Sequence, residues 1–389
     1  MRYFNYLSAH EEQELFFQCP KPIDVTNKEL LEHALGATLY MPATRSTIAQ
    51  DISGGKLKGL TSMVLCLEDA IGDNEVLKGE ESIVSQIKEL ALKVQQGTIP
   101  FEDIPFIFVR IRSAEQMKRI AQALAENIPL ITGFIFPKFT VRNGEEYLRT
   151  LLSINEGQAK PIYAMPILES PDIINIESRQ QNLLEIKSLL DSYRSLVLNV
   201  RIGATDFSGL FGLRRSPDMT IYDIRVIGSC ITDIINIFTR PDNGYVIPGP
   251  VWEFYSSERV LKPQLRQGIF AESLGQAGRG VRENIICRYI DGLIHEVILD
   301  KANGLIGKTI IHPSHIKPVQ ALCVVTHEEY MDASSILASN HGGLGVIASQ
   351  YANKMNEIKP HLRWAQKIMI KSKIYGVFNE QHNFTSLLT

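Results

Sequence analysis

The sequence predicts an α/β fold in which parallel strands alternate with helices, and three observations lead to this prediction. Short apolar runs recur along most of the chain, which is typical of strands buried on both faces of a parallel sheet. Segments with apolar residues at helical spacing lie between these runs. The first polar residue after most runs is a charged side chain, as expected where a strand ends at a site.

The amino-terminal half of the chain contains four such units of strand and helix. A helix at about residues 83–94 follows the second strand, because its apolar residues share one face and Pro100 lies beyond its end. After the third strand, Ser113 and Gln116 form a capping box that starts another helix. The four predicted strands cover residues 37–41, 63–67, 106–109 and 134–136.

The next predicted strand is the most informative, because its apolar run at residues 162–169 ends in Glu169. A carboxylate there needs either solvent or a cationic partner. Further strands are predicted at residues 196–202, 245–247 and 309–311, and helical patterns at residues 183–190, 224–238 and 285–298 separate them. Eight consecutive units of strand and helix indicate a (β/α)8 TIM barrel.

A doubly wound open sheet is the alternative fold, because it also alternates strands with helices. Such a sheet normally has fewer strands and a glycine fingerprint in its first turn. The first predicted turn, at residues 42–45, has the sequence Pro-Ala-Thr-Arg and lacks that fingerprint. The barrel is therefore the preferred prediction.

Three parts of the chain are expected. Residues 1–30 form an N-terminal extension, residues 31–325 form the catalytic barrel, and residues 326–389 form a C-terminal helical segment. In that segment, Thr326 and Glu329 make a capping box, and a last helix is expected near residues 360–369. The segment could close over the barrel mouth as a lid, contact another subunit, or simply pack as a helix.

Composition excludes several classes of protein. With 44% hydrophobic residues, 21% charged residues and a net charge of -3, the chain has ample core and no excess of basic residues, so no nucleic-acid or membrane partner is expected. The N-terminus lacks the apolar segment of a secretory signal, and no stretch is long enough to span a bilayer. The scattered cysteines lack metal-type spacing, which predicts reduced thiols in a cytoplasmic protein.

Charged residues follow strand after strand of the predicted barrel. They are Glu68, Asp69, Arg110, Lys138, Glu169 and Asp206, with His312 after the last strand. In a barrel of parallel strands these ends share one rim, where barrel enzymes place their active sites. For any single residue, a solvated or locally paired charge is the alternative.

Glu169 and Asp206 follow neighbouring strands and are expected to lie close together. Two carboxylates about 4 Å apart repel each other by roughly 4 kcal/mol at an effective dielectric near 20, so the pair requires a cation or loses a charge. Mg²⁺ fits best, because the available ligands are oxygen atoms and Mg²⁺ often takes only one or two carboxylates. The alternative is that either carboxylate pairs with Arg110 or Lys138.

Several segments resemble the citrate lyase beta-subunit-like (HpcH/HpaI aldolase) family, in the order found in that family. The segments are Tyr-Met-Pro-Ala-Thr-Arg45, Leu-Glu-Asp-Ala-Ile71, Phe-Val-Arg110, Phe-Pro-Lys138, Ile-Leu-Glu-Ser170, Gly-Ala-Thr-Asp206 and Gly-Lys-Thr-Ile-Ile-His-Pro313. They span about residues 37–340. The resemblance implies a TIM barrel and a homo-oligomer, often a trimer or a multiple of one.

The same resemblance implies roles for individual residues. Glu169 and Asp206 would bind Mg²⁺, Arg110 would contact the bound oxo-acid, and Glu68 and Asp69 would support the water shell of the metal. Arg45 and the segment Gly203, Ala204 and Thr205 are expected to bind substrate. Lys308 and His312 would shape the rim, and His312 could equally be a structural histidine.

The predicted function is a Mg²⁺-dependent carbon–carbon bond lyase, or the reverse condensation. The substrate would be a small 2-oxo or hydroxy acid or its acyl-CoA thioester, and bond cleavage would release an enolate. Arg110, Glu68, Asp69 and Lys138 are the candidate catalytic residues. The proton-transferring group stays open among Asp69, Lys138 and a residue of a neighbouring subunit.

Two other functions are weighed against this one. A thioester hydrolase could use the same metal site, and a catalytically silent barrel could serve as a binding or assembly subunit. Further basic candidates are Arg214 and Arg215, which could bind an acidic group or lie in a solvated loop. Residues 275–280, with Arg279 and Arg282, could cradle a phosphate or form a plain turn.

Overall fold

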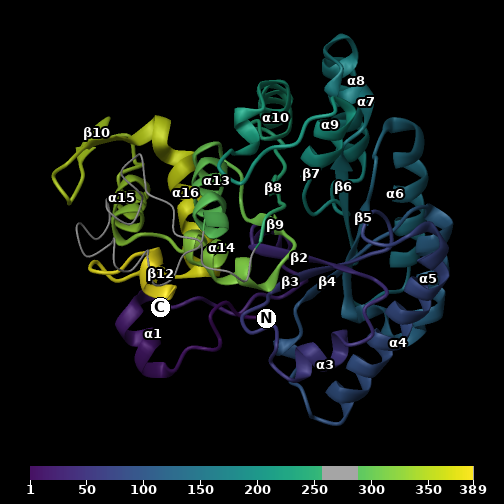
Figure 1. Ribbon diagram of the computed structural model, residues 1–389. Coiled ribbons are helices and arrows are strands. Elements are labelled where there is room, and N and C mark those ends of the chain that lie inside the picture. The colour runs from purple at the N-terminus through teal and green to yellow at the C-terminus, as the bar shows by residue number, and fades with distance from the viewer. Residues whose placement is uncertain (256–287, 389) are drawn as a thin grey trace.

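The computed structural model describes residues 1–255 and 288–388 (Figure 1). Its centre is a sheet of parallel strands in the order β7-β6-β5-β4-β3-β2-β9-β8. The strands are β2 (Ala37–Pro42), β3 (Ser62–Cys66), β4 (Phe106–Arg110), β5 (Ile131–Phe136), β6 (Tyr163–Leu168), β7 (Arg201–Ile202), β8 (Gly249–Trp252) and β9 (Lys308–Ile310). The two ends of the sheet approach each other where the Val200 N–H donates a hydrogen bond of 3.1 Å to the Val246 carbonyl. The sheet is thus a nearly closed barrel, and the predicted TIM-barrel fold is confirmed.

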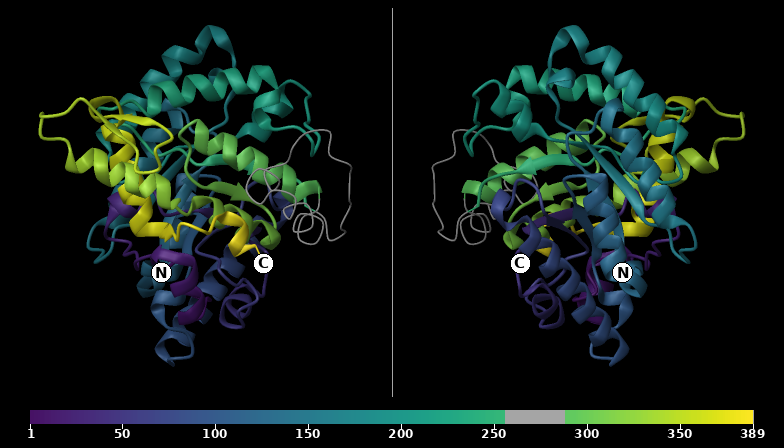
Figure 2. Two further views of the ribbon diagram at one scale, coloured as in Figure 1. Left: turned by 90° about the vertical axis from the view of Figure 1, so that its left-hand side faces the viewer. Right: turned by 90° about the vertical axis from the view of Figure 1, so that its right-hand side faces the viewer.

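Helices follow the strands and cover the outside of the barrel (Figures 1 and 2). They are α3 (Ile48–Ser53), α4 (Val76–Gln95), α5 (Ala114–Leu124), α6 (Val141–Asn155), α7 (Pro171–Ile174), α8 (Ile176–Ser192), α9 (Ala204–Leu210), α10 (Arg225–Phe238), α13 (Arg288–Ala302) and α14 (Ile316–Cys323). Ser113 caps α5, because its hydroxyl accepts the Gln116 N–H, but the predicted capping box is not complete, since the Gln116 side chain accepts the Arg112 N–H instead. The buried faces of these helices and the outward-facing strand residues form one continuous core.

Two strands differ from the prediction. The apolar run at residues 245–247 is buried but is not a ladder strand, and the strand β8 begins two residues later at Gly249. Gly249 is required there, because a Cβ atom would lie 2.2 Å from Asp300 Oδ2. The predicted strand at residues 196–202 forms ladder pairs only at Arg201 and Ile202, besides an isolated bridge at Val197.

The two ends of the chain close the amino-terminal end of the barrel. The strand β1 (Phe16–Gln18), which follows α1 (Ala9–Leu15), pairs with β12 (Val377–Phe378). The Tyr3 hydroxyl donates to the Ala34 carbonyl just before β2, and the Tyr3 ring lies 4.6 Å from the Tyr375 ring. This apolar cluster also contains barrel-interior side chains such as Phe108. The short helix α2 (Lys28–Leu31) leads from this region into the barrel.

The C-terminal segment consists of two packed helices and a hairpin. It contains α15 (His327–Ala338), β10 (Val346–Ala348), β11 (Met355–Glu357) and α16 (Ile358–Tyr375). The predicted capping box of Thr326 and Glu329 is confirmed. Helix α16 borders the residues before β8 and β9, and the Tyr375 hydroxyl donates to the His33 carbonyl. This position is at the end opposite to the strands' carboxyl ends and fits the packing-helix alternative, whereas the domain limits at residues 30 and 325 stay predictions.

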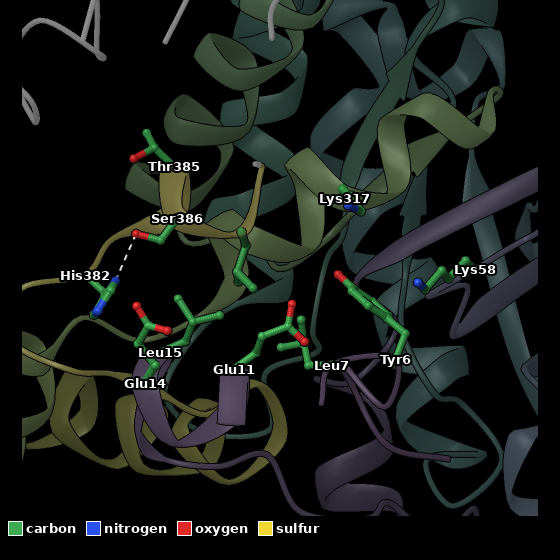
Figure 3. Close-up of a pocket in the computed structure, with 11 residues that line it drawn as sticks. Tyr6, Leu7, Glu11, Glu14, Leu15, Lys58, Lys317, His382, Thr385 and Ser386 are labelled. Carbon is green, nitrogen blue, oxygen red and sulfur yellow. Dashed lines mark hydrogen bonds between the residues drawn. The ribbon is translucent and has the colours of Figure 1, made fainter. Parts of the chain in front are cut away.

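A pocket of about 540 Å³ lies where the two ends of the chain meet (Figure 3). Glu11 and His382 line it on one side, and Lys58 and Lys317 lie near the Tyr6 ring on the other, 5.4 Å and 5.8 Å from its centroid. None of the residues predicted to form the site lines this pocket. The predicted site must therefore be sought elsewhere, at the carboxyl ends of the strands.

Two expectations from composition concern the described residues only. No helix among them is both long enough and apolar enough to cross a bilayer. The four cysteines in the described part of the chain are free thiols, and three of them are buried.

Candidate functional site

The charged residues after β3 to β7 converge at the carboxyl ends of these strands. Parallel pairing places Cys66 of β3 opposite Arg110 of β4, and Leu168 of β6 opposite Ile202 of β7. The residues that follow these positions therefore meet at one rim. They include Glu68, Lys138, Glu169 and Asp206, together with Arg110 itself.

Arg110 is the centre of this cluster and is 7% exposed. Its Nη2 lies 2.6 Å from Glu68 Oε2, 3.0 Å from Asp69 Oδ2 and 3.1 Å from Glu169 Oε1. Burial alone would lower the pKa of Arg110, but the surrounding negative charges, with Glu169 first, raise it further above its usual value. Arg110 is therefore a fixed cation.

Glu169 is 4% exposed and is held from two sides. Its Oε1 also accepts the backbone N–H of Lys138 at 2.8 Å. Burial raises the pKa of Glu169 to about 8, with Arg110 opposing this change and Asp206 adding to it. Gly203 leaves room for this side chain, because a Cβ atom there would lie 2.3 Å from Glu169 Oε2.

Lys138 connects the residues after β5 to Glu68. Its backbone has a φ of +48°, in the left-handed region that non-glycine residues rarely adopt. In this conformation its N–H reaches Glu169 while its Nζ lies 2.7 Å from Glu68 Oε1. The hydrogen bond to Glu68 raises the pKa of Lys138, whereas burial raises the pKa of Glu68.

Asp206 and Asp69 complete the negative side of the cluster. Asp206 lies in the first turn of α9 and is half-buried. Burial raises its pKa and the charge of Asp69 raises it further, while Arg110 opposes the change. Burial would also raise the pKa of Asp69, but Glu68 and Arg110 reverse this effect and hold it below its usual value. Within the described part of the chain, Asp206 has no ion-pair partner within 4.0 Å.

The charge balance of the cluster fits a divalent cation. Four carboxylates face two cations, Arg110 and Lys138, and all the acidic ligands are oxygen donors. Mg²⁺ suits such a set, because it commonly binds one or two carboxylates and several waters. No group of three or more acidic, histidine or cysteine side chains is arranged to hold a metal in the described residues. Glu169 pairs with Arg110, which was the alternative to metal binding. The ion pair with Arg110 and the binding of a metal can coexist, because the carboxylate has a second oxygen.

Two of the predicted substrate contacts, Arg45 and Thr205, bond to side chains outside the cluster. Arg45, in the loop after β2, donates to Asp51 Oδ2 on α3 from Nε at 2.9 Å and from Nη2 at 2.5 Å. The Thr205 hydroxyl donates to Glu253 Oε1 at 2.8 Å, whereas Ala204 is buried at the start of α9. The structure thus places Gly203 against Glu169, while the side chains of Arg45 and Thr205 make other contacts.

Lys308 does not shape the rim, so this expectation was wrong. It begins β9, its side chain is fully buried, and its Nζ lies 2.6 Å from Glu296 Oε1 and 2.7 Å from Asp300 Oδ2 of α13. Arg215 is not in a solvated loop either, because it is 4% exposed and pairs with the same Glu296. Only Arg214 of the two arginines is exposed.

His312 makes contacts that fit a structural role. Its Nδ1 lies 2.7 Å from the Ser314 hydroxyl, and its ring stacks on Tyr255 at 4.6 Å. The proposed phosphate cradle at residues 275–280, with Arg279 and Arg282, lies outside the described residues.

Sequence reasoning missed a residue that supports the loop of Glu68. Arg112 donates from Nε to the Leu67 carbonyl at 2.6 Å, from Nη2 to the Glu68 carbonyl at 3.3 Å, and from Nη1 to Asp73 at 2.5 Å. A second arginine two residues after Arg110 was the available signal. Arg110 is the last residue of β4, and beyond a strand end residues two apart need not point to the same face. The spacing of the two arginines therefore did not predict the contacts of Arg112.

Comparison with known proteins identifies a family for most of the chain. A family model described as C-C bond lyase of the TIM-barrel fold matches residues 29–377. A comparison with curated proteins finds no match.

Two solved structures share the fold at low sequence identity. A citrate lyase from Burkholderia xenovorans LB400 has a TM-score of 0.60 and 15% identity, covering 88% of this chain and 92% of the other. CitE from Mycobacterium tuberculosis, in complex with magnesium, acetoacetate and coenzyme A, has a TM-score of 0.51 and 16% identity, covering 88% of this chain and 99% of the other. At such identities the likeness shows the fold.

Proposed function

The chain belongs to the carbon–carbon bond lyase family of the TIM-barrel fold, and we propose that it uses Mg²⁺ to break or form a carbon–carbon bond in a small 2-oxo or hydroxy acid or its acyl-CoA thioester. The enzyme class expected from the sequence, a carbon–carbon lyase, is that of the family. Substrate and metal are the proposed parts.

The observation that carries the proposal is the cluster around Arg110. One buried guanidinium contacts three carboxylates, and a fourth carboxylate, Asp206, has no cationic partner within 4.0 Å in the described chain. Such an excess of negative charge at the carboxyl ends of barrel strands is expected where a divalent cation binds. The magnesium in the complex of CitE from M. tuberculosis supports this choice of metal.

Four residues of the cluster have proposed tasks. Glu169 and Asp206 would hold Mg²⁺, which when bound acts as a Lewis acid toward substrate oxygens. Arg110 would face the negative charge that develops when the carbon–carbon bond breaks, and its buried contacts fix its orientation before substrate arrives. Lys138 would hold a proton beside the substrate, because its side chain is 57% exposed at the rim and is held by Glu68.

Calorimetry tests the metal assignment directly. Pyruvate, oxaloacetate and glyoxylate are titrated into the protein with Mg²⁺ and then with EDTA, and binding of at least one acid is expected only with Mg²⁺. Glu169→Gln and Asp206→Asn should abolish this dependence, whereas Glu145→Gln, in an exposed ion pair on α6, should not. Absence of metal-dependent binding for all three acids would overturn the proposal and favour a binding or assembly subunit.

A metabolite extract then identifies the substrate. The protein is incubated with the extract with and without Mg²⁺, and mass spectrometry follows an acid that disappears while two fragments appear. On that substrate, Glu169→Gln should lower turnover by at least about a thousandfold, because a Lewis acid supplies several kcal/mol and each 1.4 kcal/mol is tenfold in rate. Near-normal turnover in this variant would remove Glu169 from the metal site.

A further inference from the structure

Arg201 places a buried guanidinium inside the barrel. It lies in β7 opposite Ile167 of β6 and is 2% exposed. Its Nη2 donates to Thr309 Oγ1 of β9 at 2.6 Å, and its Nη1 lies 3.9 Å from Met165 Sδ. Its Cζ is 5.7 Å from the centre of the Tyr40 ring of β2. Contacts with three other strands show that the side chain crosses the barrel interior.

Arg201 differs from the other buried arginines in its partners. Arg110, Arg179 and Arg215 each form an ion pair with a carboxylate. In the described parts of the chain, no carboxylate lies within 4.0 Å of Arg201, whose hydrogen-bond partners are a hydroxyl and a thioether. A buried charge without a counter-ion is costly, so this guanidinium is expected to serve an anion that comes from outside the chain.

Two of the residues that contact Arg201 are only partly buried. Helices cover the outer face of the barrel, yet Tyr40 and Thr309, whose side chains face Arg201, are partly exposed. The amino-terminal end is closed by Tyr3 and its neighbours, so this exposure is toward the carboxyl end. On β6, the residue paired with Arg201 is Ile167, two residues before Glu169, so Arg201 lies just below the cluster on the inner face of the barrel.

We propose that Arg201, with Thr309 and Tyr40, binds a second carboxylate of the substrate on the floor of the barrel mouth. The inference rests on the proposed function and narrows the substrate class to oxo or hydroxy acids with two carboxylates. One carboxylate would meet the cluster of Arg110, Glu169 and Asp206, and the other would meet Arg201. The planar guanidinium suits this task, because it offers several N–H donors in the geometry of a carboxylate.

The test compares two hydroxy acids that differ by one carboxylate. Racemic malate and racemic lactate are titrated into the full-length protein with Mg²⁺ by calorimetry. The wild type is expected to bind malate at least about tenfold more tightly than lactate, as for one charge-assisted contact. Arg201→Met should reduce this preference to about twofold or less, while lactate affinity stays within about threefold of wild type. Arg201→Lys keeps the positive charge but not the planar pair of N–H donors, so it should retain part of the preference for malate.

The outcomes separate this inference from the proposed function. Equal weakening of malate and lactate in Arg201→Met would show a structural role, so the inference would fall while the metal site stands. If neither acid binds the wild type with Mg²⁺, the inference falls, whereas the proposed function is decided separately by the titrations of pyruvate, oxaloacetate and glyoxylate. Thermal unfolding of each variant shows whether it is folded. If Arg201→Met does not fold, Arg201→Lys and Thr309→Val carry the test, and unchanged malate preference in both would overturn the inference.

Discussion

At the scale of single residues, Gly203 determines whether Glu169 can take up its position. We predict that Gly203→Ala lowers activity at least tenfold and destabilises the protein by about 1–3 kcal/mol, because the new Cβ would lie 2.3 Å from Glu169 Oε2 and 2.4 Å from its Cβ. Gly209→Ala, in the helix α9 that follows Gly203, is the matched control, since nothing lies within 4 Å of its added Cβ. Turnover assays and urea unfolding measure both. Equal behaviour of the two variants would contradict the steric role of Gly203.

Single residues also show what the sequence could and could not predict. Glu169, Arg110 and Lys138 were found because each stands next to an apolar run, where a charge has few structural reasons to occur. Lys308 stands next to such a run as well, but its side chain points outward under α13 while Thr309 points inward. Alternation along a strand decides this direction, and a strand of only three residues gives no pattern from which to read it.

At the scale of elements, a buried ionic cluster joins α13 to β8 and β9. Glu296 is fully buried and contacts both Lys308 and Arg215. We predict that Glu296→Ala destabilises the fold by about 3–5 kcal/mol, because it leaves two buried cations with less compensation. Urea unfolding measures this loss. Glu145→Ala removes an exposed pair with Arg149 and should change stability by about 0.5 kcal/mol or less. A loss below 1 kcal/mol in Glu296→Ala would mean that the cluster does not hold these elements together.

Element boundaries were predicted well where a strand is long and apolar, as for β4 and β6. They failed at residues 245–247, where the apolar run is buried but not in a ladder. Burial makes a run apolar, whereas a ladder needs a partner of matching length, and β7 supplies only two paired residues. The sequence pattern therefore indicates burial but not ladder pairing.

His33, a buried residue whose carbonyl accepts from the Tyr375 hydroxyl, makes the stability of the protein depend on pH. Burial lowers its pKa to about 4, below the usual value of 6.5. Protonation is therefore favoured in the unfolded chain, so its contribution to stability is complete above pH 6.5 and is lost as the pH falls toward 4. We predict that this histidine lowers the free energy of unfolding by about 1.4 kcal/mol for each pH unit between pH 6.5 and pH 4.

Urea unfolding of wild type and His33→Gln at pH 7, 6 and 5 measures this contribution. The variant should lose less stability over this range than the wild type, by about 2 kcal/mol at pH 5. His10→Gln, on the exposed surface of α1, is the control and should follow the wild type. Parallel curves for wild type and His33→Gln would show that His33 stays accessible to protons in the folded state.

At the scale of the whole molecule, the surface after α9 predicts self-association. Leu210, Phe211 and Leu213 are 51%, 45% and 43% exposed and follow one another closely at the end of α9. Exposed apolar groups of this kind usually mark contact surfaces. We predict a homo-oligomer, for which the family resemblance implies a trimer or a multiple of one, and light scattering coupled to gel filtration will give its mass. Phe211→Asp combined with Leu213→Asp should shift the mass toward the monomer, because two charges would be desolvated at the contact. Leu152→Asp, an equally exposed leucine on α6, should leave the mass unchanged. A monomeric wild type would leave this apolar surface without a second copy to cover it and would contradict the prediction.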